Sequence, residues 1–288
     1  MENTRGSLLM VASMAAFALE DMFIKAAASA LPVGQVLILF GLGGTFIFMG
    51  LTHRRNERIL HPAILSRQII IRAVCEVVGR LCFTLAIVLT PLSSASAILQ
   101  ATPLVVAMGA VVFFGEKVGW RRWLAIAVGF VGVLFIIRPG LEGFEQASLF
   151  AVVGTLGFAG RDLATRAAPP VLSNVQLGVY GFFMLIPTGF AMLIYTGGLE
   201  WPTMLAWGQL SGAIIIGVFA YYSLTAAMRT GEISVVTPFR YTRLIFALIL
   251  GVIVFSERPD TMTLLGAAII VLSGLYTVFR SGKSPRSN

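Results

Sequence analysis

Apolar stretches of membrane-spanning length recur along the whole chain, separated by short breaks of glycine, proline and charged residues. A helix needs about 20 apolar residues to cross a bilayer, and these breaks divide the chain into stretches near that length. The predicted segments are residues 7–29, 33–51, 67–90, 92–114, 120–137, 147–168, 172–196, 204–229, 232–255 and 261–280. Because most connectors are very short, consecutive segments are antiparallel neighbours. The pattern predicts an all-α membrane protein with ten transmembrane helices.

The chain also repeats itself at an offset of 141 residues. One register aligns Asp21 with Asp162, Gln35 with Gln176, Thr84 with Thr225, Ser93 with Ser234, and residues 115–117 with 256–258. We therefore predict two repeats, residues 1–141 and 142–288, the second ending in a short cytoplasmic tail. Since each repeat holds an odd number of helices, the second is inverted in the membrane. Inverted repeats place a substrate site near the bilayer centre and permit alternating access.

Composition and charge exclude a water-soluble domain. Charged residues make up 12% of the chain and mean hydropathy is +0.89, whereas soluble domains average about 25% charged residues. The net charge of +8 does not indicate nucleic acid, because the basic residues lie in connectors rather than in a patch with aromatics.

With the N-terminus inside, only Lys25, Arg138 and Arg258 fall on the outer side, so both termini are predicted to be cytoplasmic.

Several short motifs carry a family resemblance across essentially the whole chain. They are 92–99 (LSSASAIL), 102–104 (TPL) and 115–117 (GEK) in the first repeat, and 226–229 (AAMR), 234–239 (SVVTPF), Tyr241 and 255–258 (FSER) in the second. The chain resembles the drug/metabolite transporter superfamily, in its ten-helix branch with two EamA-type halves. Within this branch it is most similar to bacterial aromatic amino acid exporters, with riboflavin carriers as near neighbours. The resemblance implies a carrier that works as a monomer in the bacterial inner membrane, with a central cavity, no cofactor and no ATP hydrolysis.

Charged residues inside the predicted spans are the first candidates for function, because a charge in the bilayer is costly and usually faces a partner or an aqueous path. They are Glu20 and Asp21, then Arg72, Glu76 and Arg80, then Arg161 and Asp162, and finally Arg240 and Arg243. Arg72, Glu76 and Arg80 are four residues apart, so they form a ladder on one helix face. Arg240 and Arg243 invite pairing with Asp162 or Glu20. Structural pairing and substrate binding both remain open for each residue.

An amino acid substrate brings a carboxylate and an ammonium group, and both need partners when they leave water. An arginine fork suits the first, whereas Glu20 or Asp21 suits the second or carries a proton. Further cavity candidates, which could equally be packing residues, are Phe83, Gln100, Tyr221, Tyr222, Phe239 and Tyr241. Pro103 and Pro238 interrupt helical hydrogen bonding and are hinge candidates.

No enzyme motif is evident. The two histidines, His53 and His61, share one connector, and no P-loop, zinc-ligand spacing or nucleophile elbow occurs. We therefore predict no catalytic residue and no metal site. The favoured function is a secondary transporter that exports amino acids, aromatic and other neutral ones, by alternating access. A riboflavin or other metabolite carrier, a channel, and a membrane protein without transport activity are the alternatives.

Overall fold

The computed structural model describes residues 2–114, 120–138, 145–169, 171–228, 230 and 237–281. Within these ranges the chain forms helices and no strand, which confirms the predicted all-helical fold for the described part. The helices are α1 (Glu2–Ala27), α2 (Val33–Arg54), η1 (Pro62–Leu65), α3 (Arg67–Leu89), α4 (Leu92–Leu99), α5 (Thr102–Phe114), α6 (Trp120–Ile137), α7 (Ser148–Arg166), α8 (Asn174–Phe183), α9 (Leu185–Thr196), α10 (Met204–Met228), η2 (Thr237–Tyr241), α12 (Thr242–Phe255) and α13 (Thr261–Ser281). The motif at 115–117, Ser234 and the predicted tail after Ser281 lie outside the described residues.

Helices occupy all ten predicted segments in the described ranges. Five stretches are long and apolar enough to cross a membrane: Thr4–Ala27, Val33–Arg54, Leu92–Phe113, Asn174–Ile194 and Met204–Ala227. Trp123–Ile137 and Thr261–Ser273 are shorter apolar helices. α3 and α7 fall outside the first set because of the charged residues that they carry. That all ten segments cross the bilayer stays a prediction.

Two of the predicted segments are each divided into two α-helices, and a proline explains each break. A proline has no N–H, and its ring clashes with the carbonyl four residues earlier. Pro103 lies four residues after Leu99, where α4 ends. Pro187 lies four residues after Phe183, where α8 ends. Each proline falls in the first turns of the following helix, where its missing N–H breaks the hydrogen bond that would join the two helices.

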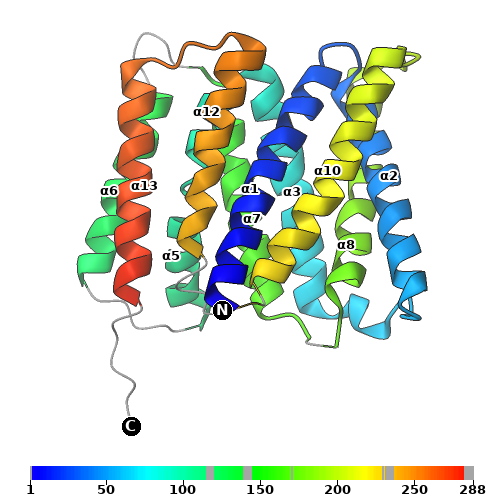
Figure 1. The fold of residues 1–288 in the computed structure, drawn as a ribbon, viewed down its shortest axis with the longest axis horizontal. Coiled ribbons are helices and arrows are strands. Elements are labelled where there is room, and N and C mark those ends of the chain that lie inside the picture. Colours follow the sequence, from blue (N-terminus) through cyan, green and yellow to red (C-terminus); the bar gives the residue numbers. More distant parts are fainter. Residues whose placement is uncertain are drawn as a thin grey trace.

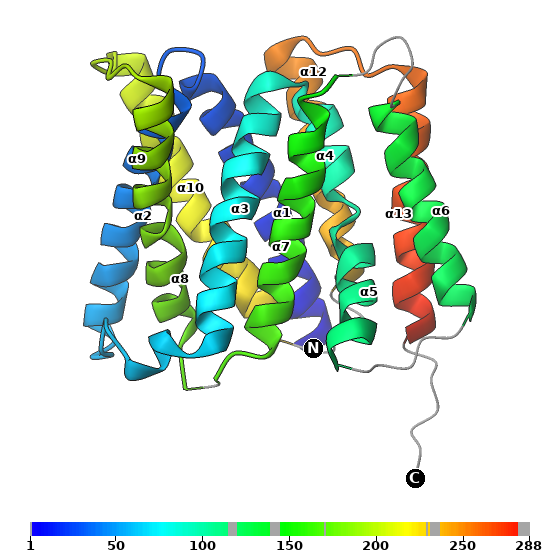
Figure 2. The ribbon, with the colours of Figure 1, turned by 180° about the vertical axis from the view of Figure 1, so that it is seen from behind.

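The helices form one bundle in which partners from the two halves of the chain lie side by side (Figures 1 and 2). α1 packs against α10 and α12, α3 against α7, α2 against α8 and α9, and α6 against α13. The contact between α3 and α7 is especially close, since a Cβ atom on Gly157 would lie 2.5 Å from the Cα of Gly79. Only residues without a side chain allow two helices to approach in this way.

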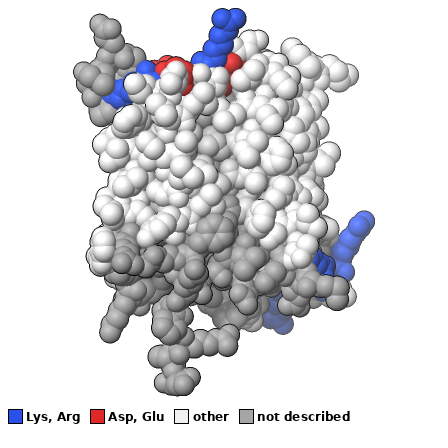
Figure 3. Space-filling model, turned by 60° about the vertical axis from the view of Figure 1, so that its left-hand side comes forward, with Lys and Arg blue, Asp and Glu red and all other residues white. Residues whose placement is uncertain are grey.

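The surface of the bundle suits lipid contact. Large apolar side chains point outward from several helices, with 67% of Phe46 and 86% of Ile194 exposed. On the face drawn in Figure 3, the described charged residues lie near the two ends and uncharged side chains cover the zone between them. The N-terminal end of α1 and the C-terminal end of α13 lie at the same end of the bundle (Figure 1).

Candidate functional site

Charged side chains from five elements meet between α1, α3, α7 and the η2–α12 segment. They are Glu20 and Asp21 of α1, Arg72, Glu76 and Arg80 of α3, Arg161 and Asp162 of α7, Arg240 of η2 and Arg243 of α12. These are the charged residues that the sequence places inside the predicted spans. All of them were identified from the sequence because a charge inside the bilayer is costly and usually has a function or a partner. The structure supplies what the sequence left open, namely which charge pairs with which.

Two of the ion pairs hold α1 to its neighbours. Arg80 contacts Glu20 at 2.5 Å, and Arg243 contacts Asp21 at 2.5 Å. Both carboxylates are fully buried. Adjacent residues on a helix point about 100° apart, so Glu20 reaches α3 while Asp21 reaches α12. A charge buried without its partner destabilises a protein by about 3–5 kcal/mol, so each pair fixes α1 in place.

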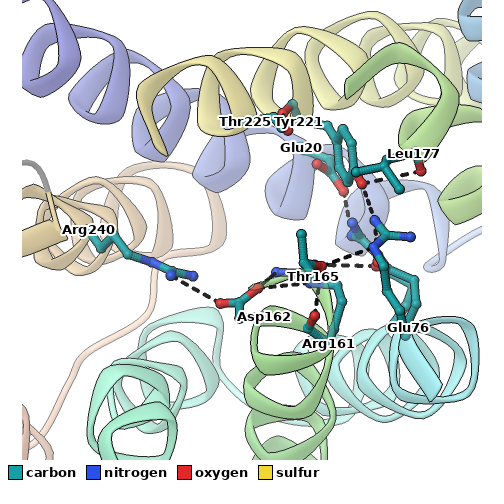
Figure 4. Close-up of polar contacts among 11 residues, drawn as sticks. Glu20, Glu76, Arg161, Asp162, Thr165, Leu177, Tyr221, Thr225 and Arg240 are labelled. Carbon is teal, nitrogen blue, oxygen red and sulfur yellow. Dashed lines mark hydrogen bonds and ion pairs between the residues drawn. The ribbon is translucent and has the colours of Figure 1, made fainter. Parts of the chain in front are cut away.

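The remaining charged residues form a continuous chain, drawn in Figure 4. Arg72 lies 3.7 Å from Glu76, and Arg161 contacts Glu76 at 3.3 Å and Asp162 at 2.9 Å. Arg240 completes the chain with a 3.1 Å contact to Asp162. We call Arg72, Glu76, Arg161, Asp162 and Arg240 the arginine–carboxylate chain. It links α3, α7 and η2.

The three residues of the ladder on α3, Arg72, Glu76 and Arg80, have partners on different helices. Arg72 faces the Tyr221 hydroxyl, to which it donates a hydrogen bond, and also donates to Thr165 at 3.1 Å. Glu76 takes Arg72 and Arg161 as partners, while Arg80 turns to α1. Of the pairings expected for the two arginines near η2, that of Arg240 with Asp162 is present, whereas Arg243 pairs with Asp21 rather than with Glu20.

A cavity opens beside these ion pairs. Its lining combines guanidinium groups with apolar and small polar side chains: Met14, Phe17, Arg80, Leu99, Gln100, Thr102, Pro103, Phe158, Arg161, Leu224, Arg240 and Arg243. Binding sites for small molecules typically place a few polar groups among apolar walls. The break between α4 and α5 lies in this wall, which brings Gln100 and Pro103 to the cavity.

The predicted cavity residues divide into two groups. Arg80, Gln100 and Arg240 line the cavity, as does the hinge candidate Pro103. Glu20, Asp21 and Asp162 stand behind the arginines as their partners and do not line it. Pro238 is the second residue of η2, and its side chain lies outside the described part.

None of the predicted aromatic residues is among the side chains that line the cavity. Phe83 is buried, packs edge-on against Phe158 and lies beneath Arg243. Tyr221 and Tyr241 are also buried, and Tyr222 receives a hydrogen bond from Arg55 at the end of α2. Phe239 is 38% exposed but is absent from the cavity wall. The aromatic wall is formed instead by Phe17 and Phe158, which the sequence repeat aligns with each other.

Comparison with known proteins gives the family. The description "EamA-like transporter family" matches residues 4–138 and 146–279. The chain belongs to this family. The EamA-type resemblance inferred from the sequence is thereby confirmed, and the protein is a multi-pass membrane protein of a transporter family rather than a member of an enzyme family.

Proteins similar to this chain are named as transporters of several different small metabolites. The chain is 25% identical over 219 residues to an S-adenosylmethionine uptake transporter of Rickettsia felis, covering 75% of this chain and 72% of that protein. A riboflavin transporter of Vibrio cholerae is 31% identical, covering 68% of this chain and 66% of that one. The pseudopaline exporter CntI of Pseudomonas aeruginosa is 25% identical, covering 93% and 94%. A solved crystal structure matches with a TM-score of 0.66 at 14% identity, covering 97% and 99%, which shows the fold alone.

Proposed function

We propose that this EamA-like protein is a secondary transporter of small carboxylate-bearing metabolites of the amino acid kind, and that it exports them across the bacterial inner membrane. The observation that carries the proposal is the set of arginines in the cavity wall. Arg80, Arg240 and Arg243 each use one terminal nitrogen for a carboxylate partner, so the other terminal nitrogen has no hydrogen-bond partner in the described part of the chain. The planar guanidinium fork matches the geometry of a carboxylate.

The apolar side chains of the cavity wall suit the apolar part of such a molecule. Met14, Phe17, Leu99 and Phe158 line the cavity together with the arginines. Apolar walls with a few placed charges favour a ligand that has one charged end and one apolar end. An aromatic or other apolar amino acid has this form.

The packing of the helices supports an inverted repeat that works by alternating access. At the offset of 141 residues, α1 corresponds to α7, α3 to α10, and α6 to α13. The packing of α1 on α10 thus corresponds to that of α7 on α3, and the packing of α6 on α13 corresponds to itself. A pseudo-two-fold axis relates contacts in this way, and two such halves can exchange conformations around a fixed site. We further propose that both termini are cytoplasmic and that the monomer is sufficient for transport.

A riboflavin carrier is the second candidate, favoured by the 31% identity to the Vibrio cholerae riboflavin transporter. Riboflavin is uncharged at neutral pH, so it gives the arginines of the cavity wall no anionic partner. A substrate of the amino acid kind therefore explains the arginines of the cavity wall better than riboflavin does.

Counterflow in liposomes tests the proposal. Purified protein is preloaded with unlabelled compound and assayed with radiolabelled phenylalanine, threonine, methionine and riboflavin, with and without a pH gradient. Saturable exchange of amino acids is expected, and Arg240→Gln should raise the half-saturating concentration. Arg138→Gln is the matched control, since Arg138 pairs with the exposed Asp260 at one end of the bundle. Exchange of riboflavin alone would overturn the proposal.

A further inference from the structure

The buried charges around the cavity do not balance. Among the residues that the structure describes, five arginines and four carboxylates meet between α1, α3, α7 and η2–α12. Arg80 with Glu20, and Arg243 with Asp21, are one-to-one pairs. The surplus therefore lies in the arginine–carboxylate chain, where three arginines share Glu76 and Asp162.

Changes in protonation cannot remove this surplus. A guanidinium group stays protonated in proteins, whereas a carboxylate can only become neutral. Any proton taken up by one of the four carboxylates would increase the excess of positive charge. The remaining partners of the chain, Tyr221 and Thr165, are neutral hydroxyl groups. Within the part of the chain that the structure describes, at least one positive charge is thus left without an anion.

The surplus faces the cavity. Arg72 is 2% exposed and does not line the cavity, whereas Arg161 and Arg240 do. Both of these arginines contact Asp162, at 2.9 and 3.1 Å, so their guanidinium groups converge on one carboxylate from two elements. An anion in the cavity beside them would extend the chain by the one negative charge that it lacks. Because an uncompensated buried charge is unfavourable by several kcal/mol, such an anion binds more strongly than a neutral molecule of the same shape.

We propose that the transported molecule carries one net negative charge, and that Arg161 and Arg240 bind its anionic group. The proposal rests on the proposed function, and it narrows the substrate class from amino acids in general to their anionic relatives. These are amino acids whose amino group is acylated or replaced, and amino acids with a second acidic group. A zwitterionic amino acid supplies a carboxylate, but its ammonium group also brings a positive charge into the site, so the excess remains.

A charge series on the unaltered protein tests this directly. At about pH 6, below the pKa of an α-amino group, phenylalaninamide is a cation, phenylalanine a zwitterion and N-acetylphenylalanine a monoanion, and all three present the same ring. N-acetylphenylalanine should compete for counterflow at a half-saturating concentration about tenfold below that of phenylalanine, because it brings the carboxylate without the positive charge of an amino group. Phenylalaninamide should be the weakest. Equal or better competition by phenylalanine would overturn the proposal.

Variants separate charge from shape. Arg240→Gln removes the surplus, so the preference for the anion over phenylalanine should disappear, while Arg240→Lys keeps the charge and should keep the preference at lower affinity. Arg138→Gln is again the control and should leave the preference unchanged. A preference that persists in a folded Arg240→Gln protein would contradict the assignment, and the series on the unaltered protein decides the matter if that variant does not fold.

Two further outcomes keep this inference distinct from the proposed function. If phenylalanine exchange depends on chloride and N-acetylphenylalanine has no advantage, chloride supplies the missing charge and the inference is wrong while the function stands. If no member of the series competes and riboflavin exchanges, the proposed function itself fails.

Discussion

A carboxylate at the end of the bundle opposite the N-terminus ties α1 and the start of α4 to the connection between α12 and α13, and we predict that its removal opens that end. Glu257, in the connection from α12 to α13, accepts hydrogen bonds from the backbone N–H groups of Leu92 and Ser93 at 2.6 and 3.0 Å, and from the Ser93 hydroxyl at 2.8 Å. Lys25 of α1 contacts the same carboxylate at 3.1 Å and donates a hydrogen bond to the Thr90 carbonyl at 2.8 Å. We call Lys25, Thr90, Leu92, Ser93 and Glu257 the Glu257 cluster.

The size of the effect follows from these contacts. Glu257 is only 9% exposed, so its interactions are little screened by water. A glutamine keeps one acceptor oxygen but loses the charge that Lys25 and the first N–H groups of α4 share. Hydrogen bonds to charged groups contribute about 1.5–3 kcal/mol each. We expect Glu257→Gln to destabilise the closed arrangement by about 2 kcal/mol, which shifts its equilibrium with an open arrangement about 30-fold.

Thiol labelling measures this shift. Cys75 and Cys82 are replaced by alanine and Gln100, in the cavity wall, by cysteine. A membrane-impermeant maleimide is then added on the side of the bilayer where Glu257 lies. Glu257→Gln should raise the labelling rate about 30-fold if labelling follows the open population.

The matched control is Asp260→Asn, which breaks the pair with Arg138 in the same connection. Asp260 is 51% exposed, and exposed ion pairs contribute little to stability. Its labelling rate should stay near that of the parent. An unchanged rate in a folded Glu257→Gln protein would refute the idea that the Glu257 cluster closes this end.

Three more predictions follow from the fold. Burial alone would raise the pKa of Glu257, but the hydrogen bonds from Ser93 and Leu92 and the charge of Lys25 outweigh burial and hold the pKa below its ordinary value. The stabilisation by Glu257 is therefore fully present above about pH 4.3 and is lost as pH falls below it, so labelling should rise in acid and stay flat in Glu257→Gln. Gly157→Ala should lower the thermal midpoint in detergent by several degrees because its Cβ meets the backbone of Gly79, whereas Gly50→Ala, with nothing within 4 Å, should not. Pro103→Ala should slow counterflow if the break beside it bends during transport, and a parental rate would exclude that role.

The fold was predictable to the extent that apolar runs and breaks encode it. Helix positions follow from these runs, and the two helix breaks follow from Pro103 and Pro187 once the four-residue reach of a proline is applied. The first was predicted only as a bend, and the second was not predicted. The residues around Phe183 are apolar and resemble an unbroken span. Pro187 was therefore the only signal in the sequence for the break after Phe183.

The site was predictable in its charged members but not in its pairings. Burial is costly for any charge, so Arg243 and Asp21 stand out in the sequence, but their contact joins residues far apart in the chain. The aromatic candidates were chosen because of the helices on which they lie. The sequence did not show which face of each helix points toward the cavity. Phe83 thus lies beneath Arg243, while Phe17 and Phe158 line the cavity. The repeat aligns these two with each other and was the signal that could have identified them.

The two ties between α1 and α12 indicate which helix moves when the Glu257 end opens. Asp21 with Arg243 joins α1 to α12, and Lys25 with Glu257 joins α1 to the connection that directly follows α12. Among the described residues, α4 forms no ion pair with α12, and the polar contacts from Leu92 and Ser93 reach Glu257, just after the end of α12. α4 is therefore the easier helix to release, and it can bend at the break before Pro103. If so, Pro103→Ala should abolish most of the labelling increase caused by Glu257→Gln, because the two substitutions act on one motion. Independent, multiplicative effects on the labelling rate would show that α4 is not the moving helix.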